Sequence, residues 1–209
     1  MKKLFALTLM VLGLTTLSGC NEQERKKSDV EAIDASIEAF LNRTIYKELT
    51  TEILKSIPDH ELEQTVYDNI YAIIGEDYEN ELDNVRKLTK GQQAIFSTWM
   101  VEAEVNNGGF NQFYFNSSGQ YANMAVDGFE TVGAVKFAEL MKEANRVYAS
   151  IEKNLEKFDD GTLESFSASY KENPLNDLDD KFYKLGESES LSGLKARYIR
   201  ENIDQFITK

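Results

Sequence analysis

Residues 134–155 have the sequence AVKFAELMKEANRVYASIEKNL, the clearest helical pattern in the chain. Apolar residues recur in it at intervals of three and four, as one buried face of an α-helix requires. They are Phe137, Leu140, Met141, Ala144, Val147, Tyr148, Ile151 and Leu155. Similar stripes occur on both sides of this stretch, and no run alternates as a half-buried strand would. The sequence therefore predicts an all-α fold: a single compact multi-helix domain.

Capping and stop signals divide the stripes into separate helices. Ser28-x-x-Glu31 and Thr89-x-x-Gln92 have the form of capping boxes, which begin helices. Pro58 and Gly75 are expected to bracket another helix, since proline suits a helix start and glycine a helix end. Further helices are predicted over residues 121–129, 162–170, 178–185 and 191–206.

The first twenty residues form a secretion pattern. Lys2 and Lys3 precede an apolar stretch too short to span a membrane, and Leu-Ser-Gly-Cys closes it at Cys20. This ending resembles the bacterial lipobox, so we expect residues 1–19 to be a cleaved signal peptide and Cys20 to be lipidated. Residues 20–27 would be a polar tether, and residues 28–209 the all-helical domain. The expected location is the cell envelope, outside the cytoplasm; Asn21 favours the outer membrane if the cell is Gram-negative.

The chain is strongly acidic. Without residues 1–19 it has 21 basic and 36 acidic residues, a formal net charge of −15. This charge disfavours direct nucleic-acid binding, which needs a basic patch. It fits either a charged surface that keeps the domain soluble or an ordered array of acids that imitates DNA.

The titratable residues form no recognisable catalytic or metal-binding pattern. His60 is the sole histidine, and the sole cysteine is Cys20, so a multi-histidine metal site within one chain is excluded. Glu102 and Glu104 are two apart and do not share a helix face. The acid clusters Asp159-Asp160 and Asp177, Asp179 and Asp180 lack the calcium-loop pattern and suit helix starts. We therefore predict no metal, no cofactor and no catalytic residues.

The most distinctive stretch lies between Trp99 and Gly119 and contains VNNGGFNQFYFNSSG at residues 105–119. A helix is expected to end at the Asn/Gly run, where a left-handed conformation is accessible, so that Gly108→Val would forbid the turn. The alternative is a ligand cleft walled by aromatic residues and read by amides. The candidate binding residues are Trp99, Glu102, Asn106, Asn107, Gly108, Gly109, Phe110, Gln112, Phe113, Asn116 and Gly119.

This stretch, together with residues 178–183 and 198–202, resembles the C-terminal domain of the DNA-mimic protein family. The resemblance covers about residues 60–207. It implies an all-helical fold, and the family's namesake is an acidic protein that binds a transcription factor in place of DNA. The family supplies no catalytic residues to carry over.

Taken together, these features favour a non-enzymatic, membrane-anchored binding module with an envelope or protein partner. The first alternative is a DNA mimic that occupies a DNA-binding protein through its acidic surface. The second is a hydrolase or sugar-binding protein that uses the Asn-Gly-Gly-Phe stretch as its pocket.

Overall fold

The computed structural model describes residues 22–207, and the chain divides into two units between Ile45 and Tyr46. The first unit contains one helix, α1 (Glu22–Leu41). The predicted signal peptide and the predicted lipidation site, Cys20, lie outside the described part of the chain. None of the helices within residues 22–207 is both long and apolar enough to cross a membrane.

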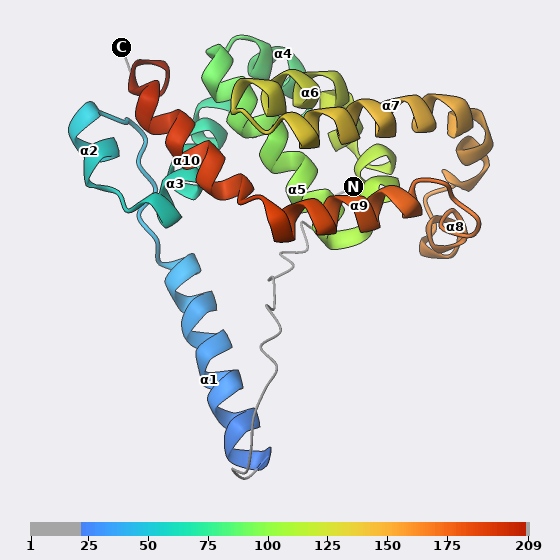
Figure 1. The fold of residues 1–209 in the computed structure, drawn as a ribbon, viewed down its shortest axis with the longest axis horizontal. Helices are drawn as coiled ribbons and strands as arrows, with labels where there is room; N and C mark the ends of the chain where they lie inside the picture. The colour runs from blue at the N-terminus through green and yellow to red at the C-terminus, as the bar shows by residue number, and fades with distance from the viewer. Residues whose placement is uncertain (1–21, 208–209) are drawn as a thin grey trace. The chain divides into compact units, whose positions relative to one another are not determined.

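The second unit is built from helices joined by short connections (Figure 1). Its α-helices are α2 (Thr51–Ser56), α3 (Asp59–Ile74), α4 (Glu81–Arg86), α5 (Lys90–Phe115), α6 (Ala122–Thr131), α7 (Val135–Leu155), α8 (Leu163–Ala168), α9 (Asn176–Ser188) and α10 (Leu191–Glu201). Short 3₁₀ helices lie at η1 (Ser117–Tyr121), η2 (Glu156–Phe158) and η3 (Ile203–Gln205). Residues 22–207 contain no strand, so the all-α prediction is confirmed.

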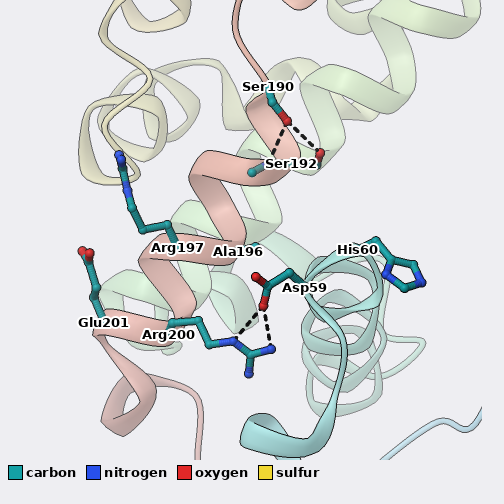
Figure 2. Close-up of a pocket in the computed structure, with 9 residues that line it drawn as sticks. Asp59, His60, Ser190, Ser192, Ala196, Arg197, Arg200 and Glu201 are labelled. Carbon is teal, nitrogen blue, oxygen red and sulfur yellow. Dashed lines mark hydrogen bonds and ion pairs between the residues drawn. The ribbon is translucent and has the colours of Figure 1, made fainter.

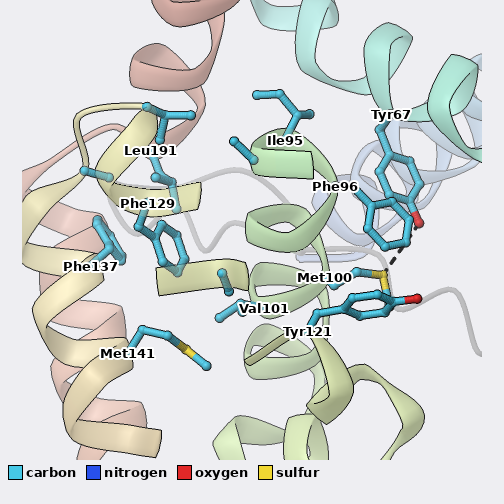
Figure 3. Close-up of a cluster of buried hydrophobic side chains, with 14 of the residues drawn as sticks. Tyr67, Ile95, Phe96, Met100, Val101, Tyr121, Phe129, Phe137, Met141 and Leu191 are labelled. Atoms are coloured by element: carbon cyan, nitrogen blue, oxygen red, sulfur yellow. Dashed lines mark hydrogen bonds between the residues drawn. The ribbon is translucent and has the colours of Figure 1, made fainter. Parts of the chain in front are cut away.

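Helix α5 is the central element of the second unit, packed against α3, α6 and α9 (Figure 1). Helix α10 lies along α3, and α7 packs on α6 and α9. Aromatic and aliphatic side chains fill the space between these helices, and Figure 3 shows Phe96, Tyr121, Phe129 and Phe137 among them. Burying large side chains of this kind supplies the main favourable term in folding.

Capping residues, proline and glycine predicted several helix boundaries correctly. Helix α3 lies between Pro58 and Gly75, and Gly75 adopts φ 74° where the helix ends. The Thr89 capping box forms in full: Thr89 Oγ1 accepts the Gln92 N–H at 3.2 Å, and Gln92 Oε1 accepts the Thr89 N–H at 3.0 Å. The helix predicted from residues 134–155 is α7, whose stripe from Phe137 to Ala144 is buried.

Two boundaries differ from the expectation. Helix α1 begins at Glu22, before the Ser28 capping box and within the segment predicted as a tether. The helix expected to end near Asn106 instead continues to Phe115 as α5, with a break in its backbone at Gly108 and Gly109. Helical structure resumes at Phe110 because side chains from elsewhere bond the backbone groups that the break frees.

Candidate functional site

The α5 kink, formed by Gly108 and Gly109, lies at the centre of the sequence motif. Gly108 has φ −157° and ψ 24°, and Gly109 has φ 75° and ψ −179°. The second conformation is accessible almost only to glycine. The special backbone position is therefore Gly109, and our explanation for Gly108→Val was wrong. A Cβ on Gly108 would instead press on the Gln112 amide and the Tyr170 hydroxyl.

Side chains that follow α8 or lie on α9 bond the backbone of the kink. Asp179 Oδ1 accepts the Phe110 N–H at 2.7 Å, at the start of the second half of α5. Tyr170 donates its hydroxyl to the Gly108 carbonyl at 2.8 Å, and Tyr183 donates to the Val105 carbonyl at 2.8 Å. These three bonds replace the intrahelical bonds that the kink removes.

The Asp179 carboxyl has an unusual environment. Burial raises its pKa from an ordinary 3.8 to about 6, and the neighbouring Asp180 adds to this, while the Phe110 N–H acts in the opposite direction. A perturbed carboxyl is a common mark of functional sites, but structural roles perturb pKa values too. Its bond to Phe110 gives Asp179 a structural role.

Glu104 organises the amides of the motif. Its Oε2 accepts the side-chain N–H groups of Gln112 at 2.7 Å and Asn116 at 2.9 Å, and its Oε1 accepts the Ser118 hydroxyl at 2.7 Å. We call these four residues the Glu104 cluster. It ties the first half of α5 to the end of that helix and to η1. Gln112 and Asn116, two of the candidate binding residues, thus direct their side-chain amides to another residue of the protein.

The sequence prediction missed a second polar network. Asn111 is buried, donates to Ser169 Oγ at 2.7 Å and accepts the Asn173 amide at 2.8 Å. Asn173 also donates to the Ser169 carbonyl and accepts the Leu175 N–H. A signal was present, since Asn111 interrupts an aromatic run. The network fixes the segment between α8 and α9, which carries Tyr170 and leads into α9, where Asp179 and Tyr183 lie.

The aromatic residues of the motif and Gly119 serve packing. Phe110 and Phe113 are buried, and Trp99 stacks on Tyr67 of α3 with ring centroids 3.6 Å apart. A Cβ on Gly119 would meet the Tyr114 backbone at 3.1 Å, so glycine allows η1 to approach α5 there. Asn106 is half-buried and Asn107 is exposed on the surface of α5.

Glu102 belongs to a different cluster from Glu104, which agrees with their placement on separate helix faces. The Lys195 ammonium, fully buried on α10, pairs with Glu102 and with Glu63 of α3. We call this group the Lys195 cluster. Burial acts to lower the pKa of Lys195, but the two carboxylates outweigh it and raise that pKa. Burial raises the pKa of Glu102, and Glu63 adds to this, while Lys195 opposes it.

A pocket of about 450 Å³ lies between the start of α3 and α10, away from the motif (Figure 2). Arg200 and Asp59 form an ion pair on its wall, and Arg200 also donates to the carbonyls of Leu54 and Ile57. Arg197 and Glu201 add one charge of each sign. The lining therefore has no net preference for anions or cations.

The remaining candidates lie apart from one another. His60 is exposed in the first turn of α3, 3.2 Å from Glu61. Asp160 accepts the Thr162 N–H at 3.0 Å and the Ser165 hydroxyl at 2.6 Å, at the start of α8. Between residues 22 and 207 no three His, Cys, Asp or Glu side chains gather as metal ligands.

Comparison with known families identifies the family of the chain. A family model described as DMP19-like protein matches residues 86–202, more than half of the chain. The chain belongs to the DMP19-like protein family. This confirms the resemblance to a DNA-mimic family. A search of curated proteins finds no match to this DMP19-like chain.

Proposed function

We propose that this DMP19-like protein is a lipid-anchored binding module of the bacterial cell envelope. It would engage a protein partner through its acidic surface and catalyse no reaction. The membrane attachment rests on the sequence around Cys20, whose thiol would carry the lipid. The outer membrane is the favoured location in a Gram-negative cell.

The binding role is inferred from the contacts of residues 105–119, whose polar groups bond other parts of the protein. Gln112 and Asn116 direct their amides to Glu104, and the freed backbone of the kink is bonded by Tyr170, Asp179 and Tyr183. Polar groups already bonded inside a protein are poorly suited to reading a ligand. The motif thus stabilises the fold. This favours a binding function on the exposed surface over a hydrolase or sugar-binding pocket at the motif.

Charge supplies the second argument. An acidic surface speeds and orients association with basic partners, and salt weakens that attraction. Binding to a basic protein should therefore weaken steeply between low and physiological salt. An affinity for a basic protein that does not change with salt would contradict a charge-driven role.

Cell fractionation tests the location. Native-host cells with the wild-type chain or Cys20→Ala are separated into membrane and soluble fractions, and the N-terminus is analysed by mass spectrometry. We expect an acylated Cys20 at the N-terminus of the membrane-bound wild type, and release of the variant. An uncleaved wild-type chain in the cytoplasm would contradict the proposed location.

Family membership favours one alternative, a DNA mimic. A mimic occupies a DNA-binding protein, so it must reach the cytoplasm or meet a basic partner outside it. It requires carboxylates spaced like phosphates on one face, and net charge alone does not establish that spacing. Two results together would favour the mimic over the envelope module. The protein would compete with DNA for a purified DNA-binding protein, and the wild-type chain would be found in the cytoplasm.

A further inference from the structure

Two tyrosine side chains are exposed together at the end of α3 and in the loop after it. Tyr71 is 37% exposed and Tyr78 62%, and the two side chains hydrogen-bond each other. We call these two residues the tyrosine patch. Exposed aromatic residues near each other mark protein interaction sites more often than single apolar residues do.

Tyr71 packs on the core of the second unit. Tyr67, one turn earlier on α3, is buried and stacks on Tyr71 with ring centroids 6.4 Å apart. Phe96 of α5 packs on the same Tyr67 ring, and the Tyr67 hydroxyl contacts Met100 Sδ at 3.8 Å (Figure 3). Trp99 of α5 also stacks on that ring. A side chain held in place by the core loses little conformational freedom when a partner binds it.

The surroundings of the patch are strongly negative. Residues 71–83 contain five acidic residues and no lysine or arginine: Glu76, Asp77, Glu79, Glu81 and Asp83. Hydrogen bonding with Tyr78 raises the pKa of Tyr71 to about 12, with further contributions from burial and from the charges of Glu81 and Glu76. Tyr71 therefore lies close enough to Tyr78, Glu76 and Glu81 for these groups to affect its ionisation.

Some of these acids are held in place, and others stay available. Asn80 donates to both oxygens of Asp77 at 3.2 and 3.0 Å, and Tyr121 donates to Glu81 at 2.5 Å. Asp83 pairs with Arg86. Glu76 and Glu79 are exposed and bond no other side chain in the described part of the chain. Two carboxylates therefore remain for a cationic partner beside two tyrosine rings.

We propose that the tyrosine patch docks an arginine-bearing segment of a basic protein partner. A guanidinium stacks on tyrosine faces and pairs with carboxylates through planar donors, which a lysine ammonium does less well. Anionic lipid headgroups would be repelled by the same acids. The inference rests on the proposed binding function. The patch lies outside the residues that the family model matches, so family membership does not assign it.

The test measures fluorescence anisotropy of two labelled peptides with the full chain in a mild non-ionic detergent. One peptide carries six arginines separated by Gly-Ser, and the other carries six lysines in the same positions. We expect the arginine peptide to bind about threefold tighter than the lysine peptide. The patch variant, Tyr78→Ala with Glu76→Gln and Glu79→Gln, should weaken arginine-peptide binding by about tenfold or more.

A matched control separates the patch from the net charge of the protein. Leu163→Ala with Glu164→Gln and Glu187→Gln removes the same charge and one exposed apolar side chain elsewhere. Circular dichroism checks that both variants fold, and the control should weaken binding by less than about twofold. If arginine-peptide binding weakens equally in both variants, or does not weaken in the patch variant, the proposed role of the tyrosine patch is wrong. The proposal of an acidic binding module would still stand. If the wild-type protein binds neither peptide at low salt, both the tyrosine patch and the acidic binding module are contradicted.

Discussion

The Asp179 carboxylate occupies the space that a side chain on Gly109 would need. A Cβ on Gly109 would overlap both the Asp179 carboxyl carbon and its oxygens, while Asp179 Oδ1 bonds the next N–H at 2.7 Å. The absence of a side chain at one residue thus allows α9 to approach and bond the kinked backbone of α5.

Gly109→Ala should destabilise the protein more than the same change at Gly75. Both glycines have nearly the same backbone angles, so each substitution adds strain of about 1–3 kcal/mol. A Cβ on Gly75 meets nothing within 4 Å, whereas one on Gly109 meets Asp179. The collision should add about 1–3 kcal/mol at Gly109. Urea denaturation measures both variants, and equal losses would show that Asp179 moves aside at little cost.

Asp179→Asn should change how stability depends on pH. The folded-state pKa of Asp179, about 6, lies above its ordinary value of 3.8, so the folded protein holds this proton more tightly than the unfolded chain. The resulting stability is complete below about pH 4 and is lost as pH rises through about 6. The free energy of unfolding of wild type minus that of the variant should fall over this range and stay constant above pH 7. A rise would mean that the ionised carboxylate is the form the fold prefers.

Glu104→Ala should destabilise by about 1–3 kcal/mol, because three donors lose their shared acceptor. Gln112, Asn116 and Ser118 all bond Glu104. The comparison is Glu130→Ala, which removes an exposed carboxylate that pairs with Lys142 and should cost less than about 1 kcal/mol. Thermal and urea denaturation measure both. Similar small losses would reopen the interpretation of this cluster as a ligand site.

Lys195→Met should cost about 3–5 kcal/mol, because it leaves two carboxylates facing each other without a cation. The matched change, Lys181→Met, removes a cation from an exposed pair with Glu143 and should cost less than about 1 kcal/mol. Burial already raises the pKa of Glu102, so the cost of Lys195→Met should shrink as pH falls and Glu102 takes up a proton. A cost that does not vary with pH would contradict this account.

Local patterns predicted the helices because periodicity, caps and glycine stops act within a few residues. The contacts that shape the motif could not be predicted in this way. Asp179 was interpreted as an acid at a helix start, and it does lie in the first turn of α9. Its second role depends on Phe110, 69 residues away, and no pattern within one helix indicates that pairing.

The Lys195 cluster shows the same limit. Lys195 occupies the apolar face of α10, between Leu191 and Ile199, and a lysine at such a position indicates a buried partner. The sequence does not say which acid it meets, since Glu63 lies 132 residues away. The kink was predicted as a turn because the glycines are visible, while the side chains that restore helical structure after it come from distant segments.

The stacking of Trp99 on Tyr67 provides a natural optical probe. The chain has one tryptophan, and its ring lies between α3 and α5 at the base of the tyrosine patch. Emission excited at the red edge of the indole band comes from this position alone. Any event that separates the two helices, or that crowds Tyr71 from outside, can therefore be followed in the unlabelled protein in real time.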